Sequence, residues 1–136
     1  MKLITKDTDN AIVAMLALEK AKGKALSAVA LSGQLHIPHP FLRRILQKLA
    51  THGMITSKRG TGGGFTLARE PGSVSVRDMV DVFQGPLRIH ACRVGGKLCE
   101  RTRTCVLRRK LQALESQLVS GLMNITLASL AEEETT

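Results

Sequence analysis

The 136-residue chain has no tryptophan or tyrosine and only three phenylalanines. Its core must therefore come from aliphatic and methionine side chains, within a hydrophobic fraction of 43%. No apolar run approaches the roughly 20 residues that cross a bilayer, and the N-terminus lacks the apolar segment of a secretory signal. We therefore expect one cytoplasmic domain, with room for an appended helix, that has no membrane partner.

Acidic residues are scarce, since 11 Asp and Glu face 20 Lys and Arg, which gives a net charge of +9. The excess is concentrated in residues 1–70 (11 basic, 4 acidic) and 88–110 (8 basic, 1 acidic). Such an excess favours a polyanionic partner, above all nucleic acid. The acidic run at 132–134 is expected to be a frayed tail. No constellation of catalytic residues is apparent, so an enzyme is not predicted.

The chain has three cysteines, Cys92, Cys99 and Cys105, in a glycine-containing segment expected to be a loop at 85–105. Three thiols cannot all pair within one chain, and cytosolic thiols stay reduced, so a metal or cluster site is favoured over a disulfide. Thiolates select zinc, copper(I) or iron–sulfur clusters. The C-x6-C-x5-C spacing is wider than a zinc knuckle, although His90 could complete a Cys3His set. An iron–sulfur cluster, zinc and redox-active thiols therefore all stay open.

The pattern in residues 1–84 predicts a winged helix-turn-helix. The apolar run at 11–18 predicts a buried first helix capped within residues 7–9. Ser27 is expected to cap a short second helix, and a third runs from Pro38–Pro40 to His52 with its basic side chains outward. Strands at 54–58 and 65–68 flank a glycine-rich turn, which predicts a hairpin wing whose Lys58 and Arg59 meet DNA.

The remaining chain is predicted to be helical. Ser75 and Asp78 form a capping-box pattern for a helix that ends at Gly85. From Cys105 to about Leu130, leucines at heptad spacing indicate one long helix whose apolar seam needs a second copy of the chain as its cover. We therefore expect a mainly α fold with a small β-hairpin wing and a long C-terminal dimerisation helix. Its parts are a DNA-binding domain at 1–84, the cofactor loop at 85–105, and the dimerisation helix with its acidic tail at 106–136.

The order of these elements, the stretch Phe41–Leu49, the wing sequence Arg-Gly-Thr-Gly-Gly-Gly-Phe and the three cysteines resemble the Rrf2 family of transcription regulators. The resemblance implies a homodimer that binds a palindromic operator in double-stranded DNA, mainly as a repressor, under the control of an iron–sulfur cluster ([2Fe-2S] or [4Fe-4S]) that senses iron, redox state or nitric oxide. A zinc-stabilised or direct thiol-sensing regulator is the alternative. The predicted DNA-binding residues are Ser27, Pro38, His39, Phe41, Arg43, Arg44, Lys48, Lys58, Arg59, Gly60 and Thr61.

The resemblance also implies that the three cysteines are the cluster ligands. Family members differ in the fourth ligand. Some use a histidine three residues after the last cysteine, where this chain has Arg108, which cannot ligate. Others use an N-terminal acid of the partner subunit, which here would be Asp7 or Asp9 and is the favoured expectation. His90 is a third candidate.

Overall fold

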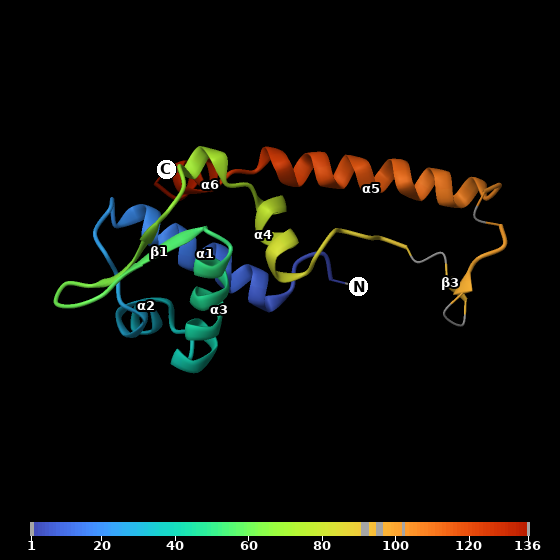
Figure 1. Cartoon of the computed structure of the whole chain (residues 1–136). Coiled ribbons are helices and arrows are strands. Elements are labelled where there is room, and N and C mark those ends of the chain that lie inside the picture. The colour runs from blue at the N-terminus through green and yellow to red at the C-terminus, as the bar shows by residue number, and fades with distance from the viewer. Residues whose placement is uncertain (1, 91–92, 95–96, 102, 136) are drawn as a thin grey trace.

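A computed structural model of the chain describes residues 2–90, 93–94, 97–101 and 103–135. Six α-helices lie in these ranges: α1 (Lys6–Lys20), α2 (Ala28–Leu35), α3 (His39–Thr51), α4 (Val76–Phe83), α5 (Val106–Asn124) and α6 (Leu127–Thr135). Two antiparallel hairpins join them, β1 (Ile55–Lys58) with β2 (Gly64–Leu67) and β3 (Arg93–Val94) with β4 (Lys97–Leu98). A short 3-10 turn, η1 (Pro71–Ser73), precedes α4. Figure 1 shows a body from which α5 projects.

The predicted mainly α fold with a hairpin wing is confirmed, and α1 is its central strut. Ala11, Ala14 and Met15 are fully buried, and α1 contacts α2, α3, α4, α6 and β2. Its cap is Thr5 rather than a residue within 7–9, because the Thr5 hydroxyl accepts a hydrogen bond from the Thr8 N–H (3.3 Å). The earlier start puts Asp7 and Asp9 in the first turn, where the helix dipole favours negative charge.

Gln84, at the end of α4, ties the N-terminal segment to the body. Its side-chain oxygen accepts hydrogen bonds from the Thr5 N–H (2.9 Å) and from the hydroxyl of Thr8 (2.7 Å), which is fully buried. Its amide nitrogen donates to the Leu3 carbonyl (3.1 Å). One side chain thus holds the start of α1 against the point where the chain leaves α4 for the cysteine loop.

The capping predictions for the helix-turn-helix and for α4 are confirmed. The Ser27 hydroxyl accepts from the Ala30 N–H (3.0 Å), and Ser75 and Asp78 form a reciprocal capping box. Two closing glycines, Gly53 and Gly85, have φ of +73° and +77°. A residue with a Cβ is strained in that left-handed region, so glycine suits both helix ends.

The prediction of one continuous helix from Cys105 to Leu130 is wrong. The chain leaves helical geometry at Ile125, and α6 begins two residues later. The break is held by backbone bonds from the Val76 N–H to the Ile125 carbonyl and from the Leu127 N–H to the Val74 carbonyl, both 2.8 Å. Leu127 and Ala131 then pack into the main core.

Two smaller expectations are also corrected. The acidic run at 132–134 lies in α6 rather than in a frayed tail, and Glu134 forms an ion pair with Lys20 at the end of α1 (2.6 Å). The cysteine segment is not entirely loop, because β3 and β4 pair within it, with Arg93 opposite Leu98. The first difference arises from a contact between residues far apart in the sequence, whereas the second is a local pairing that the expectation of a loop overlooked.

Candidate nucleic-acid interface and cysteine loop

Helix α3 is oriented by its buried side. Leu42, Ile45, Leu46 and Leu49 are at most 1% exposed and lock one face into the core. The opposite arc is left outside, and it carries the polar and basic side chains of the helix, with Arg43, Arg44, Gln47 and Lys48 all exposed. The sequence pattern of α3 therefore determines which side chains can meet a ligand.

The wing is attached to the start of α2 by backbone hydrogen bonds. The Leu26 N–H donates to the Phe65 carbonyl (3.1 Å), and the Phe65 N–H donates to the Leu26 carbonyl (2.8 Å). Gly64 permits this approach, because a Cβ there would lie 2.5 Å from the carbonyl atoms of Leu26. At the other end of the hairpin, Lys58, Arg59, Gly60 and Thr61 are all exposed. The wing tip is thus positioned by a rigid base.

An open groove of about 740 Å³ lies between α3 and the wing. Helix α3 contributes His39, Arg43 and Gln47 to its lining, and the wing side contributes Ser57 and Arg59. Within the described ranges, no acidic side chain lines this groove. A basic concave surface with one helix along its wall matches a duplex whose phosphates flank a groove that admits a helix.

The other predicted α3 contacts lie on the opposite flank of the helix. Arg44 forms an ion pair with Asp7 of α1 (3.6 Å), and its guanidinium carbon lies 5.6 Å from the ring centroid of Phe41. The Lys48 ammonium lies 5.3 Å from the ring centroid of Phe83 on α4. Arg44 and Lys48 therefore already contact acidic or aromatic side chains, whereas the Arg43 guanidinium, on the groove side of α3, has no such contact with another described residue.

The remaining predicted contacts lie at the ends of the two motif helices. Ser27 is exposed, but its hydroxyl is engaged in capping α2. Pro38 is the exposed cap residue of α3, and His39, the first residue of that helix, is partly buried in the groove lining. Sequence reasoning missed Gln47 and Ser57 as lining residues. Gln47 lies four residues after Arg43, and that spacing could have identified it.

The cysteine loop lies at the far end of α5, away from the α3 surface (Figure 1). Cys105 caps α5, and its sulfur accepts a hydrogen bond from the Arg108 N–H (3.5 Å). A helix N-terminus is a favourable place for a negatively charged ligand. Cys99 and Cys105 are both partly exposed and are not joined by a disulfide. Cys92 lies outside the described residues.

Glu115 of α5 contacts the residues that come directly before the cysteines in the chain. Its carboxylate accepts from the Ile89 N–H (3.0 Å) and pairs with Arg88 (3.5 Å). The next residue, His90, has a buried Nδ1 atom that contacts no hydrogen-bond partner in the described part of the chain. A buried imidazole nitrogen of this kind is a suitable metal ligand. Asp9, in contrast, is paired with Lys6 (3.3 Å).

The cysteine thiols and the His90 imidazole are chemically suited to bind an iron–sulfur cluster, but the described residues do not bring such groups together at one point. Soft sulfur ligands and an unpartnered imidazole suit such a group chemically. Among residues 2–90, 93–94, 97–101 and 103–135, however, no three Cys, His, Asp or Glu side chains converge on one point. The predicted ligand set therefore stays a prediction.

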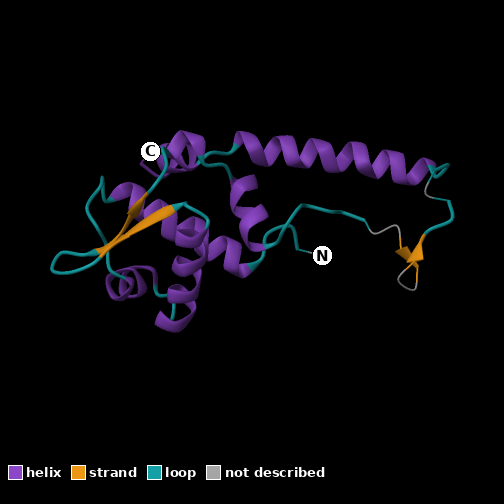
Figure 2. Cartoon of the chain, in the orientation of Figure 1, coloured by secondary structure: helices purple, strands orange, loops and turns teal. Residues whose placement is uncertain are grey.

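Most of α5 lacks a cover within the chain. Leu107 and Leu114 are 65% and 47% exposed, whereas Leu122, near the other end, is buried against Val76 and Val80 of α4. Figure 2 shows that α5 extends beyond the other helices. Its apolar seam therefore faces outward at the end near the cysteine loop. None of the helices in the described ranges is long and apolar enough to cross a bilayer.

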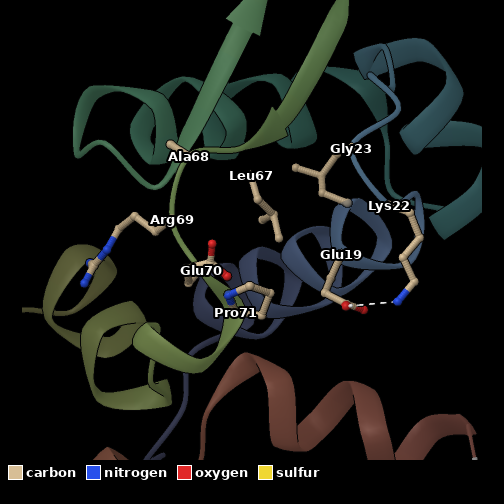
Figure 3. Close-up of a pocket in the computed structure, with 9 residues that line it drawn as sticks. Glu19, Lys22, Gly23, Leu67, Ala68, Arg69, Glu70 and Pro71 are labelled. Carbon is tan, nitrogen blue, oxygen red and sulfur yellow. Dashed lines mark ion pairs between the residues drawn. The ribbon is translucent and has the colours of Figure 1, made fainter.

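A second cleft, of about 390 Å³, lies where α1, the end of β2 and η1 meet. Figure 3 shows Glu70 and Pro71 facing the Glu19–Lys22 ion pair (3.7 Å) across it. Two carboxylates, Glu19 and Glu70, offset the two cations Lys22 and Arg69 in the lining of this cleft, so it has no excess of positive charge to attract a polyanion. The groove beside α3 is the better candidate for nucleic acid.

A helix-turn-helix followed by a wing, with a basic groove between them, defines a winged-helix transcription regulator of the helix-turn-helix type. The family model described as an iron-dependent transcriptional regulator, Rrf2, matches residues 4–133. The chain belongs to the Rrf2 family, which confirms the resemblance found in its sequence.

Named relatives and solved structures agree with this family. The chain is 25% identical to a helix-turn-helix-type transcriptional regulator of Aquifex aeolicus, over 91% of this chain and 88% of that one. It is 28% identical to the regulator IscR of an Enterobacter species, over 69% and 57%. Its fold matches IscR of T. potens (TM-score 0.76, 23% identity, 98% and 88% covered) and CymR, the global cysteine regulator of B. subtilis (TM-score 0.74, 23% identity, 98% of both).

Proposed function

We propose that this chain is a regulator, mainly a repressor, that binds a palindromic operator as a homodimer and carries an iron–sulfur cluster on Cys92, Cys99 and Cys105. The observation that carries the proposal is that the two ends of α5 contact different parts of the molecule. One end is capped by Cys105, and the other is packed on α4 of the DNA-binding body. A change at the cysteine loop is therefore connected to α3 through a series of packed helices, from α5 to α4, from α4 to α1 and from α1 to α3.

Each half of a symmetric dimer would present one α3 and one wing. Arg43 and Arg59, which line the groove, face the duplex, and Lys58, Gly60 and Thr61 contact its backbone at the wing. A second copy covers the exposed leucines of α5, because a helix in a protein gains most of its stability from packing its apolar face. The two α5 helices then set the spacing between the two α3 helices.

The cluster, when bound, supplies a redox- and ligand-responsive centre. The chain's own residues hold it and transmit its state. Cys105 fixes one sulfur to the start of α5, and Glu115 holds the backbone just before His90. Arg101, Arg103 and Arg109, which are exposed around the loop, offset the negative charge of bound thiolates.

The fourth ligand is open to two sources. Asp7 or Asp9 of a second copy is one source, although each is already paired with a cation within its own chain. His90 is the other, and its unpartnered buried Nδ1 supports it. The competing function is direct thiol sensing without a cluster, and the partly exposed, unbridged thiols of Cys99 and Cys105 support it.

Anaerobic reconstitution separates these functions. We expect purified protein to bind iron and acid-labile sulfide with visible cluster absorption, and replacement of any one cysteine by alanine to abolish that absorption. Uptake of stoichiometric zinc without sulfide would instead indicate a zinc-stabilised module. Protein that takes up no metal but forms an oxidised thiol product would indicate direct thiol sensing.

Cluster-loaded variants then identify the fourth ligand. If His90 ligates, His90→Ala changes the cluster's electron paramagnetic resonance spectrum and removes its nitrogen coupling, whereas Asp7→Ala and Asp9→Ala leave both unchanged. If an acid ligates, the spectrum of the matching aspartate variant changes instead, and no nitrogen coupling is present in the unmodified protein.

A further inference from the structure

Helix α3 carries two sets of side chains that differ in what they already contact. Arg44 and Lys48 are engaged by Asp7, Phe41 and Phe83 on one flank. The Arg43 guanidinium and the Gln47 carboxamide, on the groove side, form no hydrogen bond or ion pair with any other described residue. Apart from the hydrogen bonds of the helix backbone, Gln47 contributes only its carbonyl, which accepts a bond from the Thr51 hydroxyl (2.9 Å).

The distance between Arg43 and Gln47 along α3 is close to the rise of two base-pair steps in a DNA duplex. Four residues advance an α-helix by about 6 Å and return to nearly the same face. Base pairs along DNA are about 3.4 Å apart. Two side chains in this relation therefore reach base edges about two base-pair steps apart when the helix follows the groove.

The chemistry of the two side chains specifies different bases. A guanidinium makes paired hydrogen bonds to O6 and N7 of guanine, and a carboxamide makes paired hydrogen bonds to N6 and N7 of adenine. The carboxamide is neutral, so Gln47 adds little to the attraction for phosphates. A neutral, unpartnered amide on a basic groove wall has base readout as its natural role.

We propose that Gln47 is a specificity-determining residue that reads an adenine about two base-pair steps from a guanine read by Arg43, in each half of the operator. The inference rests on the proposed binding of DNA through α3 and deepens it. Arg44 and Lys48, which contact side chains of the protein body, contribute DNA contacts that do not depend on the base sequence.

Selection from a randomised duplex pool tests the assignment. The unmodified dimer, Gln47→Ala, Arg43→Ala and Arg44→Ala are each used to enrich sequences at the same salt concentration. We expect Gln47→Ala to lose about tenfold preference for adenine at one position of each half-site and to keep the others. Arg43→Ala loses a guanine about two steps away, and Arg44→Ala weakens binding to all sequences alike.

A second substitution at Gln47 tests whether the preferred base changes to the one that the new side chain should recognise. Gln47→Glu replaces a donor and acceptor with an acceptor only, which suits the N4 amino group of cytosine. The preferred base at the Gln47 position therefore changes from adenine to cytosine. Because Gln47 is exposed, both Gln47 variants should unfold at the temperature of the unmodified protein.

The failures of the two proposals are distinguishable. If the unmodified protein enriches no sequence, the proposed operator binding fails and this inference with it. If it enriches an operator but Gln47→Ala and Gln47→Glu keep every base preference, only the role of Gln47 is overturned. Loss of preference far from the Arg43 position would also overturn it.

Discussion

Single residues hold the parts of this molecule in place where backbone elements approach one another. Gln84 joins the N-terminal segment to the end of α4 through three hydrogen bonds, and Gly64 allows the wing to contact Leu26. Neither residue lies in the candidate interface itself. Substitution of either residue would therefore affect DNA binding only by shifting the elements that carry the interface.

Gln84→Ala is expected to lower the free energy of unfolding by about 1–3 kcal/mol. The reason is that the buried Thr8 hydroxyl loses its shorter hydrogen bond (2.7 Å) and keeps only the Thr5 hydroxyl (3.0 Å) as a partner. The Thr5 N–H and the Leu3 carbonyl also lose their bonds to Gln84. Chemical denaturation followed by circular dichroism measures the change, with Gln34→Ala on the exposed surface of α2 as the matched control. Equal stability of the two variants would contradict the role assigned to Gln84.

Gly64→Ala is expected to cost about 2 kcal/mol or more and to weaken DNA binding. The new Cβ would meet backbone atoms of Leu26 at 2.5 Å, and the φ of +144° disfavours any side chain. Gly72→Ala is the control, because nothing lies within 4 Å of its added Cβ. Denaturation and fluorescence anisotropy on an enriched operator measure both effects. An unchanged midpoint and affinity would show that the wing adapts freely.

At the scale of elements, the sequence predicts the features that depend on residues close together in the chain. The caps at Ser27 and Ser75 follow from side chains that bind nearby N–H groups, and the buried face of α3 follows from its i, i+3, i+4 leucines and isoleucine. The family and fold could be predicted for the same reason, since the wing and helix patterns are local.

The break between α5 and α6 was missed because a longer-range contact causes it. Ile125 continues the heptad spacing, yet its carbonyl bonds to Val76, about 50 residues earlier. One local signal was available. Thr126 and Ser129 cap α6 reciprocally (3.0 and 3.1 Å), and a hydroxyl residue followed three positions later by another hints at a helix start. The arrangement of the cysteine donors could not be predicted, because loop closure has no periodic signature.

Leu114→Glu is expected to dissociate the proposed dimer, raising its dissociation constant by about two orders of magnitude or more. The side chain is 47% exposed in the single chain, so the monomer fold should survive. Analytical ultracentrifugation measures the association. Ser116→Glu, an exposed position on another face of α5, is the control with the same added charge. Dimers of unchanged affinity in both variants would place the interface elsewhere.

At the scale of the whole molecule, positive charge is concentrated in two regions at opposite ends of the structure (Figure 1). A basic groove lies between α3 and the wing, and a second basic segment contains the cysteines. Figure 1 shows that α5 runs from the side of the body where α4 and α6 lie toward β3. Under the proposed function, a small rearrangement at the cysteine end of α5 would displace α4, which α5 contacts at its other end, and through α1 it would shift α3. A two-state change in the spacing of two α3 helices would alter the fit to a palindrome with fixed half-site separation.

The most direct measurement is the affinity of one dimeric preparation for one enriched operator, with and without its cluster. Fluorescence anisotropy is recorded anaerobically at a fixed salt concentration, and iron and sulfide are quantified in the same samples. We expect the two forms to differ at least about tenfold in dissociation constant, which corresponds to a coupling free energy of about 1.4 kcal/mol. Equal dissociation constants for the loaded and cluster-free dimers would contradict the proposed link between the cysteine loop and DNA binding.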